Sequence, residues 1–307
     1  MSRKYLWGID LGGTKIEAVV LDAENNYNIL ARERTETNGH LGYETVLKNV
    51  CSIIKNVSEK YEIPIANIGI GTPGSINPHT NLLRNCNSLY LNGNPFHLDL
   101  EKALGVPVKI TNDANCFAIS EYKMGVVKDK GLDAQVVFGV IMGTGVGAGV
   151  VVNGQIIEGK NGIGGEWGHN FLDASGGNCY CGKSGCIETI LSGPSLERFY
   201  FEKTKKKKKL KEIVEDYRAQ LDDVSVETME RLFYFFPKAI SSIINVIDPD
   251  VIVIGGGLGN IDELYSKGLE KLPQFVFSDY IETDFLKPKF GDSSGVLGSA
   301  LLWDQKQ

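Results

Sequence analysis

The 307-residue sequence contains no apolar run close to the roughly 20 residues that a membrane-spanning helix needs. It has no excess of positive charge either, because 32 lysines and arginines face 38 aspartates and glutamates, a net charge of −6. Neither a membrane nor nucleic acid is therefore favoured as a partner. The 36 glycines show no Gly-X-Y period, and 42% of the residues are hydrophobic, which excludes collagen, disorder and coiled coil. We expect a folded, cytoplasmic protein of two lobes.

Strand patterns joined by glycine-rich turns alternate with helical patterns along the chain. Residues 5–10 and 16–21 predict two strands joined by a tight turn, and residues 43–61 predict a helix. The order of strand, glycine turn and strand returns over residues 136–152. This internal repetition indicates two α/β lobes of related architecture.

The division between the lobes is expected near residue 115, where a strand ends at an Asn/Asp cap that opens a helix. Residues 1–115 would form a small N-terminal lobe, completed by a C-terminal helix at about 296–307. Residues 116–295 would form the larger lobe, with a metal-binding loop at 169–186.

The first glycine turn carries chemically useful side chains. Glycine turns expose main-chain N–H groups, which is the arrangement that a phosphate needs. The carboxylate of Asp10 could hold Mg²⁺ beside Gly12, Gly13, the Thr14 hydroxyl and the Lys15 ammonium. This set suits a nucleoside triphosphate, although an ordinary polar hairpin is the favoured interpretation of the segment taken alone.

Three of the six cysteines fall within eight residues, at Cys179, Cys181 and Cys186. With His169 they offer three thiolates and one imidazole, a closed tetrahedral set suited to structural Zn²⁺. The Cys-x-Cys spacing is shorter than the usual Cys-x₂-Cys, and a disulfide or three free thiols is the alternative.

The Lys-rich stretch Lys203–Lys211 is the one basic block of the chain. It lacks interleaved aromatic residues, so we expect a solvated loop or helix face rather than a nucleic-acid site.

Six motifs together resemble the ROK family of sugar kinases and repressors, in order and spacing, over nearly the whole chain. They are Asp10-Leu-Gly-Gly-Thr-Lys15, Thr111-Asn-Asp-Ala-Asn115, Gly143-Thr-Gly-Val-Gly147, Gly165-Glu-Trp-Gly-His169, Cys179-Tyr-Cys-Gly-Lys-Ser-Gly-Cys-Ile-Glu188 and Val253-Ile-Gly-Gly-Gly257. Within the family, the segments 73–75, 85–88, 91–96, 165–170 and 292–295 most resemble bacterial fructokinases that also accept mannose.

The resemblance implies a two-lobed actin-like ATPase (ribonuclease H-like) α/β fold, with sugar and ATP meeting in the cleft between the lobes. It implies an ATP-dependent hexose kinase that phosphorylates the 6-hydroxyl of fructose, and next of mannose, and that forms a homodimer. N-acetylhexosamine, glucose and allose kinases of the same family are the alternatives. A sugar-responsive repressor is less favoured, because only nine residues precede Asp10 and a helix-turn-helix module needs more.

The resemblance also assigns roles to the residues of the transfer reaction. Asp113 would be the general base for the attacking sugar hydroxyl, although an Asp in this context is also typical of a helix N-cap. Asn112 would bond a neighbouring hydroxyl. The sugar-binding residues would be Asn87, Glu166, His169 and Glu188.

For the nucleotide, the resemblance implies that Asp10, Thr14 and Lys15 organise Mg²⁺ and the transferring phosphate. The residues that would line the nucleotide are Gly12, Gly13, Gly143, Thr144, Gly145, Gly147, Gly255, Gly256 and Gly257. It also makes structural zinc the favoured interpretation of the cysteine cluster. One nitrogen of His169 would then bind the metal, and the other would be free to meet the sugar.

Overall fold

The computed structural model describes residues 4–304, except for the side chain of Asp292. The first residues of the chain, the last residues of the expected C-terminal helix and the Asp292 side chain of the 292–295 motif therefore lie outside the description. Across the described residues, no helix combines the length and the apolar character that crossing a bilayer requires.

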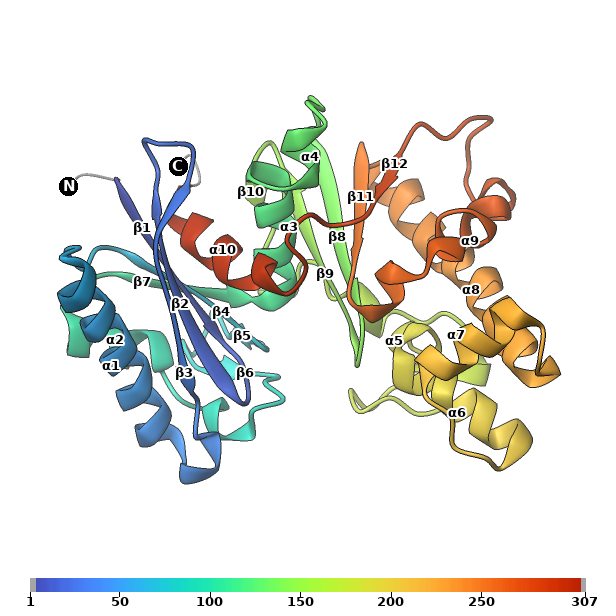
Figure 1. The fold of residues 1–307 in the computed structure, drawn as a ribbon, viewed down its shortest axis with the longest axis horizontal. Coiled ribbons are helices and arrows are strands. Elements are labelled where there is room, and N and C mark those ends of the chain that lie inside the picture. Colours follow the sequence, from blue (N-terminus) through green and yellow to red (C-terminus); the bar gives the residue numbers. More distant parts are fainter. Residues whose placement is uncertain (1–3, 305–307) are drawn as a thin grey trace. The chain divides into compact units, whose positions relative to one another are not determined.

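A five-stranded mixed sheet forms the centre of the N-terminal part (Figure 1). Its strands, in the order β3-β2-β1-β4-β7, are β3 (Asn28–Glu36), β2 (Lys15–Asp22), β1 (Tyr5–Leu11), β4 (Ile68–Thr72) and β7 (Val108–Asn112). β1, β2 and β3 run antiparallel, whereas β1, β4 and β7 are parallel. β4 is buried along its whole length, as its apolar Ile-Gly-Ile-Gly-Thr sequence requires.

A second five-stranded sheet repeats this topology, which confirms the repetition expected from the sequence. Its order β10-β9-β8-β11-β12 comprises β10 (Gln155–Ile156), β9 (Val146–Val152), β8 (Val136–Met142), β11 (Val251–Gly255) and β12 (Asp284–Leu286). β8, β11 and β12 are parallel, as β1, β4 and β7 are in the first sheet. The β1–β2 turn and the β8–β9 turn thus occupy equivalent places.

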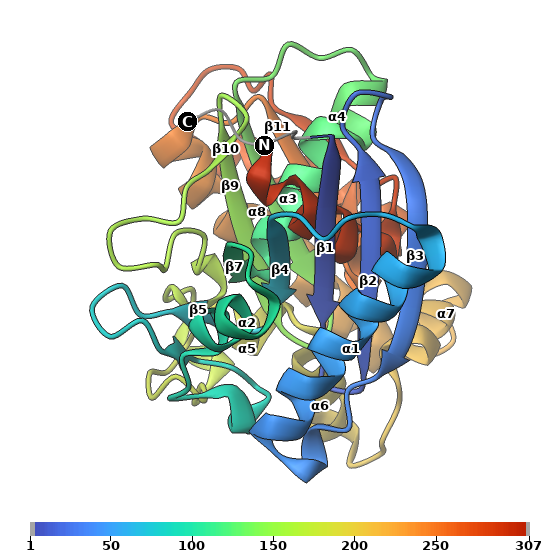
Figure 2. The ribbon, with the colours of Figure 1, turned by 90° about the vertical axis from the view of Figure 1, so that its left-hand side faces the viewer.

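Helices cover both faces of the first sheet. The helices are α1 (Tyr43–Tyr61) and α2 (Phe96–Leu104) on one face, and α3 (Asp113–Lys123) and α10 (Ser294–Ala300) on the other. Figure 2 shows α1 and α2 on the near side of the strands. Glycine permits the close approach of α10, because a Cβ at Gly69 would lie 1.8 Å from the Ser299 carbonyl oxygen.

The remaining helices complete the chain. They are α4 (Val126–Asp129), α5 (Glu188–Leu191), α6 (Gly193–Thr204), α7 (Leu210–Ala219), α8 (Asp223–Ile247) and α9 (Lys267–Glu270). A short hairpin, β5 (Ser75–Ile76) with β6 (Leu83–Arg84), follows β4.

The chain divides into two compact units whose limits differ from the expected lobes. The first unit lies within residues 1–132, 149–165 and 290–307, and the second within 133–148 and 166–289. The expected boundary near residue 115 would separate α3 from its packing partner α10. A Cβ at Gly298 would lie 1.8 Å from the Cys116 carbonyl oxygen, so α3 and α10 pack closely and share the first unit.

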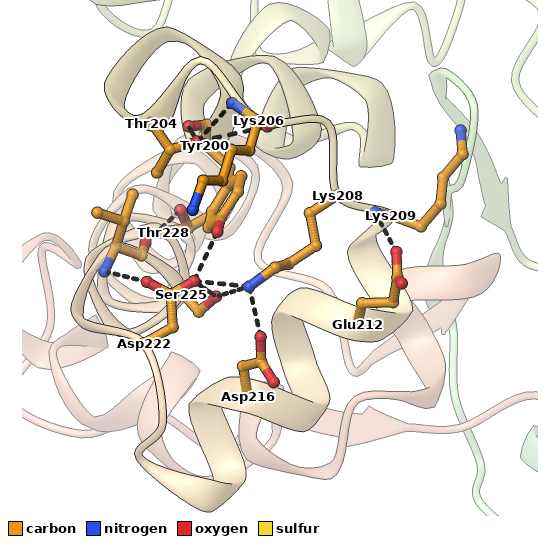
Figure 3. A network of polar contacts seen from close by, with 11 residues as sticks. Tyr200, Thr204, Lys206, Lys208, Lys209, Glu212, Asp216, Asp222, Ser225 and Thr228 are labelled. Carbon is orange, nitrogen blue, oxygen red and sulfur yellow. Dashed lines mark hydrogen bonds and ion pairs between the residues drawn. The ribbon is translucent and has the colours of Figure 1, made fainter.

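The stretch Lys203–Lys211 spans the connection between α6 and α7. Its Lys208 side chain is only 20% exposed, and Nζ donates to Asp222 Oδ2 at 2.6 Å and also to Asp216. Figure 3 shows this network at the start of α8. The prediction of a solvated surface is therefore correct for Lys205–Lys207, whose side chains are exposed. The prediction is wrong for Lys208, because its ammonium links Asp216 of α7 to Asp222, the N-cap of α8.

Candidate active site

The β1–β2 turn brings together the residues expected to hold phosphate and Mg²⁺. Asp10 is near the end of β1, and the Gly12 N–H donates to the Lys15 carbonyl at 3.0 Å to close the turn. Gly13, Thr14 and Lys15 are exposed at its tip. A Cβ at Gly13 would lie 3.6 Å from Ser88 Oγ, so the loop that carries Asn87 is beside the turn.

The Asp10 carboxylate lies among other acids. The pKa of Asp10 is raised to about 6, chiefly by burial and then by the charges of Asp113 and Glu17, while Lys15 and Arg34 act to lower it. Carboxylates that disfavour each other's charge suit a bound cation, because a divalent ion reverses the sign of the local field. The oxygen ligands present at Asp10 therefore fit Mg²⁺.

Asp113 stands where β7 gives way to α3. Asn112 Oδ1 accepts from the Asn115 N–H at 2.7 Å, so Asn112 and not Asp113 is the N-cap of α3. The helix-cap interpretation of Asp113 is thus wrong, since the residue already lies in the first turn. Asp113 Oδ1 accepts the adjacent Ala114 N–H, at 2.8 Å.

The environment of Asp113 suits a general base. Its side chain is exposed, so that a ligand can reach it. Protein around the group nevertheless desolvates the carboxylate and raises its pKa above the ordinary value, against the lowering effect of the Ala114 N–H. A reachable carboxylate that holds a proton more readily than usual is what proton abstraction from a hydroxyl requires.

The loop that carries the exposed Asn87 is held by Asn92, a residue to which the sequence patterns gave no role. Asn92 Oδ1 accepts from the Cys86 N–H at 2.9 Å, and Asn92 Nδ2 donates to the Cys86 carbonyl at 3.0 Å. This pair of bonds closes the loop on the residue just before Asn87. The only sequence signal for it was the position of Asn92 within the 91–96 segment.

In the second unit, residues that lie outside the β8–β9 turn hold it in place. The Gly193 N–H donates to the Gly143 carbonyl at 2.8 Å, and Glu188 Oε2 accepts from the Val146 N–H at 2.9 Å. A Cβ at Gly145 would lie 2.6 Å from the same Glu188 oxygen. Glu188, expected as a sugar ligand, therefore also holds the turn expected to line the nucleotide, which leaves its other oxygen for a ligand.

The third glycine turn, after β11, packs on the end of β8. Gly256 has a φ of +77°, and a Cβ there would lie 2.4 Å from the Met142 carbonyl oxygen, so only glycine fits. Gly257 has nothing within 4 Å of its Cβ position. Since Met142 adjoins Gly143, the two turns of this unit are adjacent. Thr144 is exposed and Gly147 follows in β9.

The four expected metal ligands lie together. The ligand atoms of His169, Cys179, Cys181 and Cys186 are all within 4.8 Å of one another. Three thiolates and an imidazole are a donor set that zinc prefers for structural sites. His169 Nδ1 is 3.6 Å from Cys179 Sγ, so this nitrogen is the one that would bind the metal.

The other nitrogen of His169 already has a protein partner. His169 Nε2 is 3.0 Å from the hydroxyl of Tyr180, with the two rings edge to face. Sequence reasoning missed Tyr180 and left this nitrogen free for sugar. Desolvation, with the charges of Glu188 and Glu166, raises the pKa of Tyr180 to about 12, so both expected sugar-binding carboxylates of this unit act electrostatically on the tyrosine.

The expected site residues thus form two sets. Asp10 to Lys15, Asn87, Asn112 and Asp113 belong to the first unit, whereas the other two glycine turns, Glu166, His169, Glu188 and the cysteines belong to the second.

Comparison with known proteins identifies the class to which this fold and these residues belong. The family model "ROK family" matches residues 6–306, and the chain belongs to the ROK family. Its α/β fold is of the actin-like ATPase type, as expected from the sequence. The ROK hexokinase from Thermus thermophilus shares a TM-score of 0.86 at 28% identity, over 97% of each chain.

Relatives of similar length carry a more particular name. The chain is 36% identical to the N-acetyl-D-glucosamine kinase of Histophilus somni, over 97% of this chain and 98% of the relative. It is 34% identical to the N-acetyl-D-glucosamine kinase of Pasteurella multocida, over 98% and 99%. A ROK family glucokinase from Streptomyces griseus, solved with glucose and AMPPNP, has a TM-score of 0.74 at 26% identity and covers 97% and 98%.

Proposed function

We propose that this chain is an ATP-dependent sugar kinase that transfers the γ-phosphate to the 6-hydroxyl of N-acetyl-D-glucosamine. The observation that carries the kinase assignment is the exposed, desolvated Asp113 carboxylate, close enough to Asp10 to raise its pKa. The named relatives support the N-acetylhexosamine alternative over the fructose preference expected from the shorter motifs.

In this proposal the first unit performs the chemistry. Asp113 accepts the proton of the sugar 6-hydroxyl, so that the oxygen attacks the γ-phosphorus as the bond to ADP breaks. Asp10 would hold Mg²⁺, which neutralises phosphate charge when bound. Lys15 and the main-chain N–H groups of the turn orient the phosphates.

The second unit supplies binding groups. Glu166 and Glu188 accept hydrogen bonds from sugar hydroxyls, and the turns at Gly143–Gly147 and Gly255–Gly257 line the nucleotide. His169, Cys179, Cys181 and Cys186 would hold a structural zinc, whose role is to fix the orientation of the His169 ring. A sugar that binds His169 Nε2 must share or displace the Tyr180 hydroxyl. A homodimer is also part of this proposal, and light scattering tests it.

A coupled ADP-release assay on a panel of sugars tests the proposal. The panel holds N-acetylglucosamine, N-acetylmannosamine, glucose, mannose, allose and fructose. We expect the highest kcat/KM for N-acetylglucosamine. A higher value for fructose would show the substrate assignment to be wrong while the kinase assignment stood. ADP release that no sugar stimulates would contradict the kinase assignment itself.

A further inference from the structure

A buried threonine outside every motif holds the β1–β2 turn. Thr37 follows β3 directly, and its side chain is 0% exposed. Its Oγ1 donates to the Gly12 carbonyl at 2.7 Å, and its N–H donates to the Thr14 carbonyl at 3.0 Å. Both acceptors belong to the turn that carries the proposed phosphate-binding groups.

Thr37 is in turn fixed by a helix. Asn49 Nδ2 of α1 donates to the Thr37 carbonyl at 3.1 Å. The hydroxyl, the N–H and the carbonyl of Thr37 therefore all have hydrogen-bond partners. The β2–β3 pairing ends at Lys15 and Glu36, so the Thr37 N–H extends the ladder by one bond beyond the strand. The turn is thereby connected through β3 to α1 rather than protruding alone.

The hydroxyl of Thr37 determines which way one peptide group faces. The Gly12 carbonyl and the Gly13 N–H belong to the same planar trans peptide, so they point in opposite directions. Fixing the carbonyl toward Thr37 therefore directs the Gly13 N–H away from it. Among the described residues, the Gly13 N–H has no hydrogen-bond partner, and Gly13 is exposed.

This control is needed because the peptide lies between two glycines. Glycine accepts positive and negative φ about equally, so a Gly-Gly peptide can rotate with little steric cost. In the described part of the chain, the one hydrogen bond within the turn runs from the Gly12 N–H to the Lys15 carbonyl and does not involve the Gly12–Gly13 peptide. Without the Thr37 hydroxyl, the exposed N–H would have no fixed direction before a ligand arrives.

We propose that Thr37 is a positioning residue for the nucleotide, which orients the Gly12–Gly13 peptide so that the Gly13 N–H is ready to bind a phosphate oxygen. The inference rests on the proposed function, because it takes the β1–β2 turn as the phosphate site. Thr37 itself is buried beneath the turn and touches no substrate. Its contribution is preorganisation, which lowers the cost of ordering the turn upon binding.

Thr37→Val tests the inference, because it removes the hydroxyl and keeps the branched shape. We expect the KM for MgATP to rise about tenfold, since the Gly12 carbonyl loses its buried donor. The KM for the sugar should change less than about twofold, and Thr37→Ser should restore the KM for MgATP. The matched control is Thr35→Val, an exposed threonine two residues earlier in β3, which should leave both values unchanged.

Two further measurements separate the possible results. Urea unfolding of each variant shows whether Thr37→Val folds. If it does not, Asn49→Ala loosens Thr37 more mildly, because it removes one half-buried hydrogen bond, and we expect the KM for MgATP to rise about two- to threefold. Equal changes in both KM values, or a loss of stability with no change in the KM for MgATP, would overturn the positioning role.

Lys15→Met distinguishes failure of this inference from failure of the proposed function. If Lys15→Met raises the KM for MgATP and Thr37→Val does not, the turn binds nucleotide and the role of Thr37 is wrong. If neither variant changes it, the turn is not the phosphate site, and the proposed function loses its nucleotide-binding residues as well.

Discussion

The β1–β2 turn and the β8–β9 turn occupy the same place in two sheets of identical strand order, yet their chemistry differs. The first turn is flanked by Asp10 and Lys15 and is held by the buried hydroxyl of Thr37. The second, Gly143–Gly145, has no charged residue of its own and is held by Glu188 and the Gly193 N–H. The same backbone arrangement therefore carries charged side chains at the β1–β2 turn and only main-chain polar groups and the Thr144 hydroxyl at the β8–β9 turn.

The difference indicates a division of labour. Charge is expensive to bury, so it is placed where a cation and a transferring phosphate need it. Main-chain N–H groups carry no net charge and suit the part of a nucleotide that only has to be held. On this account, the first unit provides the charged groups of the transfer together with phosphate contacts, and the second provides binding alone. The following experiments sharpen or break that contrast.

The largest effect is expected at Asp113. Asp113→Asn should lower kcat by about 10²- to 10⁴-fold, the usual contribution of a general base, with sugar affinity retained. Steady-state kinetics and calorimetric titration with the sugar check the two parts. Asp284→Asn, an exposed acid of β12, is the control. Turnover within tenfold of the unaltered protein would show that the first unit does not supply the base.

The next effect concerns Asp10 and pH. Its pKa is about 6 in the folded protein against an ordinary 3.8, so the folded state binds more protons than the unfolded state between these values. Stability therefore falls as the pH rises through this range. Asp10→Asn removes the penalty. We expect it to raise the free energy of unfolding above pH 6 by up to about 3 kcal/mol in metal-free buffer.

Urea unfolding at a series of pH values measures this effect. The difference between Asp10→Asn and the unaltered protein should vanish below about pH 3, which lies under the ordinary pKa of 3.8, so that the carboxylate is protonated in both states. Thr144→Ala, in the uncharged turn, is the comparison and should show no such pH dependence. If the free energies of unfolding of Asp10→Asn and the unaltered protein differed by the same amount at every pH, burial of the Asp10 charge would not be the cause of the difference.

Loss of the metal from the cluster of His169, Cys179, Cys181 and Cys186 is expected to have a smaller effect than the changes at Asp113 and Asp10. We predict about one zinc per chain by metal analysis. Cys181→Ser should lose the zinc and weaken sugar binding by roughly 10- to 100-fold, because the orientation of His169 depends on the metal. Cys51→Ser, a half-buried cysteine of α1, should retain both. Full activity in a preparation free of zinc would remove the metal from the account.

The smallest effects should come from adding a methyl group to either turn. A Cβ at Gly143 meets nothing within 4 Å, and at Gly13 only Ser88 Oγ at 3.6 Å, so neither Gly143→Ala nor Gly13→Ala should disturb the fold. We expect each to raise the KM for MgATP a few-fold, because the methyl group would crowd a phosphate. Unchanged kinetics in both variants would place the nucleotide elsewhere.

Local sequence patterns predicted the features that depend on neighbouring residues. Glycine turns after apolar strands predicted the hairpin at Asp10 and its repetition at Gly143, because few residues other than glycine allow such turns. The spacing of the three cysteines with His169 predicted a cluster that the fold indeed assembles. These features needed no knowledge of distant contacts.

The features that were missed depend on contacts between distant residues. Thr37 lies in a polar stretch and gives no signal that its hydroxyl reaches Gly12, 25 positions away. Tyr180 reads as a spacer between two cysteines until the fold places it on His169. The two compact units differ from the expected lobes because α3 packs on α10, and no pattern near residue 115 reveals that partner.

The most direct test of the central claim is to follow the phosphorus itself. MgATP and N-acetylglucosamine are incubated with the protein, and the products are recorded by ³¹P nuclear magnetic resonance. The account predicts that ADP and a sugar 6-phosphate form in equal amounts and that Asp113→Asn abolishes both signals on the same timescale. Inorganic phosphate in place of the sugar phosphate, or products that Asp113→Asn still forms at the normal rate, would contradict it.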